Sequence, residues 1–281
     1  MPWQMKLVAK MALSRLPVPF SVWRRLSVFR HGGMRGGAYA LAVFERHLKY
    51  ICNRGGLTGK ILLELGPGDS VASGLLASIH GAQQTILVDT GDYIVRDIDL
   101  YREMLSGWQK HGLNVQALLK CRSFDQLSRE SRIIYLTDGL SALRSIESSS
   151  VDIQFSNSVL QHVRLSQFDE TLRELRRILR TGGCAFHEVD LRDMLGGALN
   201  NLRFSDRVWE SMLFANSGFY SNRIRYHEML KAFKSNGFEV EVTKESRWTV
   251  LPISRKSMSP RFRLLDEDNL LVSVFNVSLK G

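Results

Sequence analysis

From Lys60 onward, short apolar runs alternate with longer stretches in which apolar residues recur at helical spacing. This alternation is typical of βαβ units and predicts an α/β fold with a doubly wound, mostly parallel sheet. The apolar runs are predicted strands, and the stretches between them are predicted helices. We expect the strands at residues 61–65, 84–88, 132–136, 151–155 and 184–189, and the helices at 70–80, near 94–111, from about 159, and at 168–180.

The alternation breaks after the fifth predicted strand. Residues 191–230 contain glycine and asparagine pairs and many aromatic side chains. We interpret them as an inserted helical segment that lies across the strand ends as a cap. Two later runs rich in Val and Phe, at 238–243 and 270–279, are predicted strands that can pair as an antiparallel C-terminal edge of the sheet.

Residues 1–55 have a different pattern, which predicts an N-terminal helical segment. Apolar residues at helical spacing predict a short amphipathic helix, which Pro17 and Pro19 end. Further helices are predicted over about 20–28 and 38–51, with a glycine-rich break between them. The apolar positions of the first helix are Met5, Val8, Met11 and Ala12.

The net charge of +10 comes entirely from this N-terminal part of the chain. Residues 1–60 hold eleven Lys or Arg and a single acid, Glu45, whereas acids and bases balance over the rest. A neutral body is typical of an enzyme that acts on small molecules. The 44% of hydrophobic residues exclude a disordered chain.

The basic segment has three interpretations. Its helices can pack on the rest of the protein and present solvated basic faces. Alternatively, residues 1–35 form a surface for anions, because basic amphipathic helices with Trp and Phe suit a membrane face or a phosphate-bearing substrate. Nucleic acid is the third partner and is disfavoured, since we find no zinc-finger spacing and no aromatic RNA-binding motif.

Cysteine usage and hydropathy bear on the compartment. Cys52, Cys121 and Cys184 are too far apart for a disulfide framework or a metal knuckle. Lys or Arg interrupts each apolar stretch before it reaches the roughly 18 residues of a membrane-spanning helix. We therefore expect a cytoplasmic protein, peripheral on the inner face of the membrane if the basic segment binds lipid.

A glycine-rich turn, Glu64-Leu65-Gly66-Pro67-Gly68, follows the first predicted strand. Glycines there let a ligand approach backbone that a Cβ would block. Asp89 ends the second strand, about 20 residues later, where an acid can accept hydrogen bonds from ribose hydroxyls. Turn and acid together predict a nucleotide-like cofactor. A dinucleotide motif would need a third glycine where the chain has Val71.

The turn resembles the acidic-x-Gly-x-Gly motif of the class I S-adenosylmethionine-dependent methyltransferases. The resemblance covers residues 56–281 and implies a Rossmann-like domain with S-adenosyl-L-methionine as its cofactor. In the family, the backbone and glycines of this turn hold the methionine end and the ribose. The third small residue of the motif, often glycine, is Ser70 in this chain.

Three further segments match the family in order. Residues 137–140 resemble the segment that meets the adenine, residues 151–163 a strand and helix that end in Leu-x-His-Val, and residues 172–183 a helix with a Gly-Gly turn. The resemblance implies these cofactor-binding residues: Glu64, Leu65, Gly66, Pro67, Gly68, Asp89, Thr90, Asp138, Gly139, Leu140 and Asn157.

Catalytic groups are expected where the fourth and fifth strands end. Asp190 is the first choice for binding the acceptor or taking its proton, His187 is the second, and His162 is the third. Each has a structural alternative. For Asp190 it is an ion-paired loop with Arg192 and Asp193, and for His162, where we favour it, a structural histidine on a helix turn. Strand alternation puts His187 and Asp190 on opposite faces.

The sequence thus predicts an enzyme that transfers a methyl group in line from S-adenosylmethionine to oxygen of a carbohydrate or other small acceptor. The reaction needs no metal in principle, and the seven His are not spaced as ligands. The arrangement resembles methyltransferases of bacterial surface-polysaccharide synthesis. Two alternatives stay open. They are an RNA methyltransferase that uses the basic segment, and an inactive partner protein, which the intact turn and Asp89 disfavour.

Overall fold

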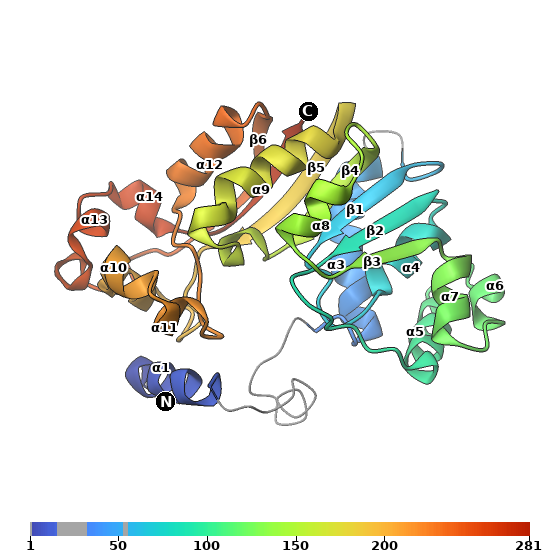
Figure 1. Ribbon diagram of the computed structural model, residues 1–281, viewed down its shortest axis with the longest axis horizontal. Coiled ribbons are helices and arrows are strands. Elements are labelled where there is room, and N and C mark those ends of the chain that lie inside the picture. The colour runs from blue at the N-terminus through green and yellow to red at the C-terminus, as the bar shows by residue number, and fades with distance from the viewer. Residues whose placement is uncertain (1, 16–32, 53–55) are drawn as a thin grey trace. The chain divides into compact units, whose positions relative to one another are not determined.

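The computed structural model describes residues 2–15, 33–52 and 56–281 (Figure 1). The helix predicted over 20–28 lies outside these residues. By internal contacts the chain divides into two units. Unit 1 comprises the described residues of Met1–Arg30 with Ser158–Leu172 and Glu188–Val277. Unit 2 comprises the described residues of His31–Asn157 with Arg173–His187 and Ser278–Gly281.

Within the described chain, seven strands form one sheet in the order β3-β2-β1-β4-β5-β7-β6. β1 pairs in parallel with both β2 and β4, and β2 pairs in parallel with β3. The carboxyl ends of these four strands therefore meet at one edge, as the sequence predicts. The bounds are β1 Ile61–Leu65, β2 Gln84–Val88, β3 Ile133–Leu136, β4 Val151–Asn157, β5 Leu179–Asp190, β6 Glu239–Arg247 and β7 Val272–Lys280.

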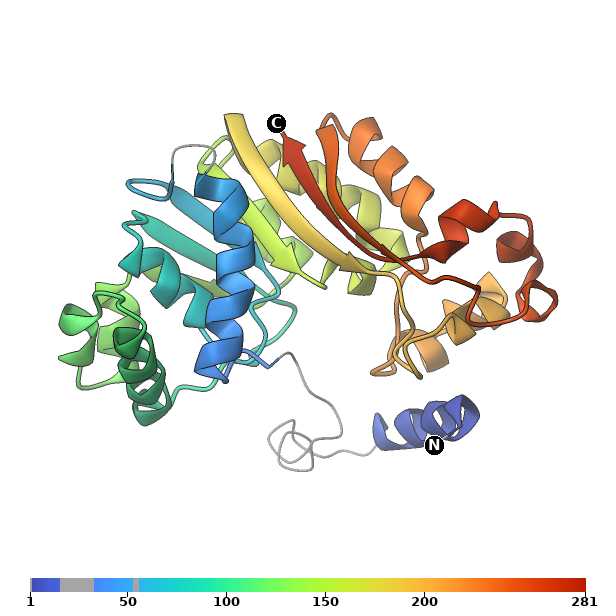
Figure 2. The ribbon, with the colours of Figure 1, turned by 180° about the vertical axis from the view of Figure 1, so that it is seen from behind.

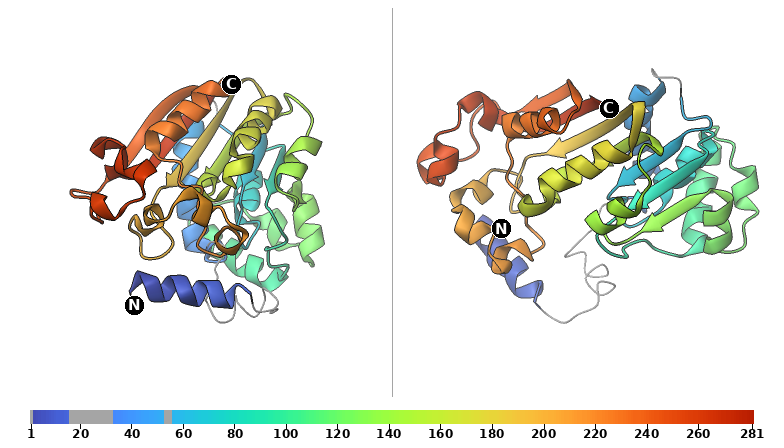
Figure 3. Two further views of the ribbon diagram at one scale, coloured as in Figure 1. Left: turned by 60° about the vertical axis from the view of Figure 1, so that its left-hand side comes forward. Right: turned by 45° about the horizontal axis from the view of Figure 1, so that its top comes forward.

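The last strand, β7, runs antiparallel to β5. Leu191 N–H donates to Ser273 O at 2.8 Å, and Gly281 N–H donates to Gly183 O at 3.3 Å. Residue numbers therefore rise along one strand as they fall along the other. β6 lies beside β7 in both views of Figure 3. The predicted antiparallel C-terminal edge is confirmed.

The core of unit 2 lies between its parallel strands and three helices that cover one face of them, as Figure 2 shows for α3. Leu62, Leu87 and Phe155 of the strands pack there with Phe44 of α3 and Trp108 of α5. The Trp108 indole N–H donates to Gly37 O at 2.9 Å. The helices of this unit are α3 Gly37–Cys52, α4 Ala72–Ile79, α5 Ile98–Lys110, α6 Gln116–Leu119, α7 Phe124–Glu130 and α8 Leu140–Ser145.

Unit 1 has two apolar clusters among short helical turns. One centres on Trp209, which is fully buried, and the other on Phe262. Residues 191–230, predicted as a helical insert, contain η2 Asn200–Arg203, α10 Asp206–Trp209, α11 Met212–Ala215 and the start of α12 Tyr226–Ser235. The other short elements of unit 1 are η1 Leu160–His162, η3 Arg255–Ser257, α13 Pro260–Arg263 and α14 Glu267–Leu271.

The predicted N-terminal helix is present as α1, Trp3–Leu13. Trp3, Leu7 and Met11 contact the Trp209 cluster of unit 1, so one of the four predicted apolar positions, Met11, packs there. Met5 and Val8 are 56% and 63% exposed. The helix is apolar over a wide arc, so sequence periodicity alone does not identify the packed side.

Two further predictions need correction. The helix predicted at 168–180 is α9, Leu165–Ile178, and the following residues already belong to β5. Gly183 allows this early start, because a Cβ there would lie 2.9 Å from Asp152 O of the neighbouring strand. The helix predicted from about 159 is only the 3₁₀ turn η1.

Candidate functional site

The glycine turn sits at the carboxyl end of β1. Gly66 and Gly68 have φ of 72° and 74°, a region that favours glycine. Gly66 N–H donates to Val88 O at 2.8 Å, which ties the turn to the end of β2. Leu65 and Pro67 complete the turn and are buried. The backbone of the turn is thus fixed against the strand that carries Asp89.

Ser70 takes the place of the third glycine and has a structural purpose. It is fully buried, and its Oγ donates to Met34 O at 2.8 Å. Its neighbour Asp69 is also buried, and its Oδ1 has no hydrogen-bond partner among the described residues. Burial raises the pKa of Asp69, whereas Arg35 lowers it. The loop at Met34 and Arg35 therefore adjoins the turn. The sequence analysis did not identify Asp69 as a buried acid of this turn.

Glu64 begins the motif but lies inside the protein. Its carboxylate is 2% exposed and accepts a hydrogen bond from Ser73 Oγ on α4. Burial raises the pKa of Glu64 to about 8, and Asp89 raises it further against the opposing effect of Ser73. Glu64 thus anchors the turn to the helix that follows it.

Asp89 lies half-buried at the end of β2. Its Oδ1 accepts from Thr90 N–H at 2.7 Å. Burial raises the pKa of Asp89 to about 6, and the N–H groups of Thr90 and Gly68 oppose that rise. Gly139 N–H donates to Asp89 O at 2.8 Å, and a Cβ on Gly139 would lie 3.2 Å from Thr90 Cγ2. The segment after β3 therefore lies close against Asp89.

The remaining predicted cofactor residues follow β3 and β4. Asp138 is exposed, and Leu140 opens α8. Asn157 ends β4, and its Oδ1 accepts from Arg46 at 3.1 Å. All eleven predicted cofactor residues belong to unit 2 and lie at the carboxyl ends of adjacent parallel strands. Positive-φ glycines at the turn and a half-buried acid at the end of β2 fit a bound nucleoside.

His187 is unsuited to exchange protons with an acceptor. Its ring is 2% exposed, and Nδ1 lies 2.8 Å from Ser156 Oγ on β4. Burial lowers the pKa of His187 to about 3, and His47 lowers it further. The ring is therefore neutral at physiological pH and packs inside unit 2.

Asp190 ends β5 in unit 1 and forms an ion pair. Its carboxylate accepts from Arg192 at two side-chain nitrogens, 2.9 and 2.7 Å away, and from Arg192 N–H at 2.9 Å. Asp193 is buried and holds the following loop by accepting from Leu195, Gly196 and Asn200. The ion-paired loop considered as the structural alternative is thus present, with Asp193 as its anchor.

His162 lies on η1 in unit 1. Its Nδ1 is 2.8 Å from Tyr220 O. Desolvation lowers the pKa of His162, whereas the Tyr220 carbonyl and Asp190 raise it. Part of the His162 surface is open to solvent. The Tyr220 contact gives His162 a structural function in holding the segment that follows α11.

A polar pocket in unit 1 includes Asp190 and Arg192 in its wall. Its cavity is about 10 Å³, about the space of one water or hydroxyl oxygen. Four of its buried side chains each have a polar atom without a partner among the described residues. These atoms are Gln161 Oε1, Asn201 Oδ1, Arg223 Nε and Arg225 Nε.

The polar pocket brings together residues that are far apart in sequence. Gln161 follows β4, Asn201 lies in η2, and the two arginines precede α12. Arg223 has φ of 59°, uncommon for a residue other than glycine, and such strain concentrates at functional sites. Gln161 is the variable position of the Leu-x-His-Val segment and Asn201 lies in no motif, so the sequence analysis identified neither as a candidate.

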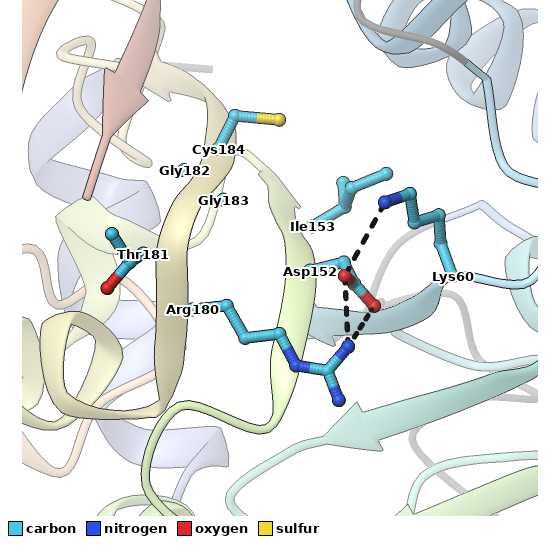
Figure 4. Close-up of a pocket in the computed structure, with 8 residues that line it drawn as sticks. All are labelled: Lys60, Asp152, Ile153, Arg180, Thr181, Gly182, Gly183 and Cys184. Carbon is cyan, nitrogen blue, oxygen red and sulfur yellow. Dashed lines mark hydrogen bonds and ion pairs between the residues drawn. The ribbon is translucent and has the colours of Figure 1, made fainter.

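A second pocket, of about 130 Å³, lies in unit 2 (Figure 4). Asp152 faces Arg180 at 3.0 Å and Lys60 at 3.7 Å there. Asp152 is the second residue of β4 and Lys60 precedes β1, so this pocket is at the end of the strands opposite the glycine turn. The three charges form an ion-pair cluster, and none is a predicted site residue.

Among the described residues, no three His, Cys, Asp or Glu side chains gather as metal ligands would. In the part of the chain that the structure describes, no helix is both long and apolar enough to span a bilayer.

Residues 63–186 match the family model of the methyltransferase domain. No curated protein matches the chain. A solved structure, the YcgJ protein of Bacillus subtilis, is 14% identical over 85% of this chain and 97% of its own, with a TM-score of 0.47. A putative S-adenosylmethionine-dependent methyltransferase of Listeria monocytogenes is 14% identical over 86% and 99%, with a TM-score of 0.47.

Phosphoethanolamine N-methyltransferase 2 of Haemonchus contortus is 15% identical over 84% of this chain and 53% of its own, with a TM-score of 0.45. The glycine turn, Asp89 and the four parallel strands around them all lie within or at the matched residues 63–186. The chain therefore carries a methyltransferase domain over residues 63–186, within a Rossmann-like α/β fold.

Proposed function

We propose that this enzyme transfers the methyl group to a hydroxyl oxygen of a carbohydrate or a similar polyhydroxylated small molecule. The observation that carries the proposal is the polar pocket beside Asp190. Gln161, Asn201, Arg223 and Arg225 line one small cavity, and each has a buried polar atom without a partner among the described residues, two of them acceptors and two of them donors. A hydroxyl group both donates and accepts, so it suits this mixture better than an apolar or purely anionic group.

The cofactor assignment is part of the proposal. The eleven residues at the strand ends of unit 2 would hold S-adenosylmethionine, with Asp89 accepting from ribose hydroxyls and the glycine turn donating from its backbone. When bound, this cofactor supplies a methyl group already activated by its sulfonium. The protein then has to align an acceptor oxygen and remove its proton.

We propose Asp190 as the base that takes this proton from the acceptor. It lies at the end of β5, three residues after His187, and its side chain is 24% exposed. Arg192 holds the carboxylate in one orientation through two side-chain hydrogen bonds. His187 is buried and neutral, and His162 is tied to Tyr220, so both are assigned positioning functions.

The basic residues 1–35 are proposed to hold the enzyme against a phosphate-bearing surface, peripheral on the inner face of the membrane. The sequence supports this with its concentration of Lys and Arg. In the described part of this segment, α1 includes Lys6 and Lys10, and Arg15 follows it.

The test is transfer of labelled methyl from S-adenosylmethionine into fractionated extract of the source cell. We expect label in the glycan or glycolipid fraction, and none with an Asp89→Ala variant. Gln161→Leu should lower kcat/KM for the acceptor about tenfold and leave the affinity for S-adenosylhomocysteine unchanged, because it removes one acceptor atom from the polar pocket.

Label in RNA would overturn the acceptor class and favour RNA methylation. A Gln161→Leu variant with full activity on the labelled acceptor would overturn the assignment of the polar pocket, even if the acceptor is a glycan.

A further inference from the structure

Helix α1 has an apolar face on each side. Trp3, Leu7 and Met11 face the Trp209 cluster of unit 1. Met5 and Val8 lie on the opposite side and are 56% and 63% exposed, and Ala12 continues that side one turn later. Exposed apolar side chains that recur at helical spacing form an apolar stripe that a binding partner can cover. The contacts within unit 1 leave this side of α1 uncovered.

Exposed apolar side chains also occur on the two segments that α1 contacts. Lys10 Nζ donates to Met194 O at 3.1 Å, and Arg15 Nη2 donates to Leu213 O at 2.9 Å. The side chains of Met194 and Leu213 are 43% and 47% exposed, and Met212 beside them is 76% exposed. We name as the outer surface the exposed side of α1, formed by Met5, Val8 and Ala12.

The charges around the outer surface are positive. Residues 2–15 include Lys6, Lys10 and Arg15 and no acid. The carboxylate that acts on Lys10, that of Asp193, is buried and holds its own loop.

The acids of the neighbouring α10 and its C-cap are engaged within unit 1. Asp206 pairs with Arg223 at 2.6 Å, and Glu210 accepts from Tyr220 at 2.8 Å. An apolar surface bordered by cations thus remains.

We propose that the outer surface docks on an anionic lipid bilayer, with α1 lying in the plane of the interface. Exposed Met and Val would enter the acyl boundary while Lys6, Lys10 and Arg15 meet lipid phosphates, which is how interfacial amphipathic helices bind. A second copy of the chain fits less well, because it would bring the same cations face to face. The inference rests on the membrane contact proposed above for residues 1–35, which it assigns to the outer surface, and it does not depend on which acceptor is correct.

The test is co-sedimentation of the full chain with vesicles of phosphatidylcholine, with and without phosphatidylglycerol. We expect binding to the mixed vesicles to be at least about tenfold tighter. A Met5→Ser/Val8→Ser variant should lose about tenfold or more of that binding, since two apolar side chains no longer enter the membrane. Lys6→Gln should lose about fivefold.

The matched control is Val250→Ser/Leu264→Ser. These side chains are 73% and 87% exposed but lie outside the outer surface, so this variant should bind vesicles like the wild type. Affinity for S-adenosylhomocysteine should be the same in every variant, which separates this test from that of the proposed function and reports that each variant is folded.

Three results would overturn the inference. One is equal binding to neutral and anionic vesicles. Another is unchanged binding of the Met5→Ser/Val8→Ser variant, which would mean that another part of the chain makes the contact. The last is a wild-type dimer in sedimentation that the same variant converts to monomer without loss of vesicle binding, because the outer surface would then join two copies.

Discussion

The Arg192 side chain donates two hydrogen bonds to the carboxylate of Asp190, from Nε to Oδ1 at 2.9 Å and from Nη2 to Oδ2 at 2.7 Å. The pair is partly open to solvent, with side chains 47% and 24% exposed. Surface ion pairs of this kind add little stability. We infer that the pair is kept for orientation of the carboxylate.

An Asp190→Asn variant should therefore lose about a hundredfold or more of kcat, because the amide cannot take a proton. Arg192→Gln should lose about tenfold, since the carboxylate remains but is free to turn. Both should bind S-adenosylhomocysteine like the wild type in calorimetry. If Arg192→Gln costs as much as Asp190→Asn, orientation is the wrong explanation and Arg192 itself binds the acceptor.

Cofactor binding should weaken in acid. Burial raises the pKa of Asp89 to about 6, and only its charged form accepts two hydrogen bonds from ribose hydroxyls. Affinity for S-adenosylhomocysteine should therefore be complete above about pH 7 and fall about tenfold by about pH 5. Calorimetric titrations across this range measure it. The control is Asp89→Asn, which should bind weakly at every pH, and a parallel loss in that variant would assign the pH dependence to another group.

Glu64 should destabilise the folded protein as pH rises. The pKa of its buried carboxyl is raised from 4.5 to about 8, so the folded state keeps a proton that the unfolded chain has released. The unfolded state binds fewer protons between these values, and stability falls as pH rises through that window.

Replacing Glu64 with Gln removes this titration. Glu64→Gln should stabilise the protein at about pH 8 by on the order of 3 kcal/mol, and should change little near pH 4. Denaturant unfolding at the two pH values measures the difference. A variant that is destabilised equally at both would indicate that the charged carboxylate is needed for folding.

The start of β5 should be intolerant of a side chain. A Cβ on Gly183 would lie 2.8 Å from Leu179 Cδ1 and 2.9 Å from two backbone oxygens, on Arg180 and Asp152. Moving these backbone atoms apart is energetically costly, so Gly183→Ala should lower the free energy of unfolding by about 2 kcal/mol or more. Thermal unfolding measures it.

Gly107 provides the matched control. It lies inside α5, and a Cβ there meets nothing within 4 Å. Gly107→Ala should stabilise the protein by about 1 kcal/mol, since alanine favours helix. Equal effects of the two substitutions would mean that packing around Gly183 relaxes freely.

Local sequence predicted the parallel half of the sheet well. β1 and β2 have the bounds that their apolar runs predict, and the acid after β2 lies against the glycine turn as the spacing requires. These features depend on contacts between neighbouring strands and on turn chemistry, both of which leave local marks in a sequence.

The parts that depend on distant contacts were not predictable. The polar pocket joins Gln161, Asn201 and Arg225 from three separate segments, and no local pattern connects them. His187 looked like an accessible base, yet packing of β4 against it buries the ring. Contacts with Trp209 and its neighbours, some 200 residues away, determine which side of α1 is packed. The periodicity of the helix does not reveal these contacts.

Strand β7 inserts between β5 and β6, although it follows both along the chain. β6 has β7 as its neighbour in the sheet, so it has no strand partner until β7 has been synthesised. A nascent chain that has reached Arg247 therefore exposes two unpaired strand edges at once, and such edges are templates for aggregation. Expression yield should then depend more on how quickly translation passes from β6 to β7 than on the stability of the finished fold.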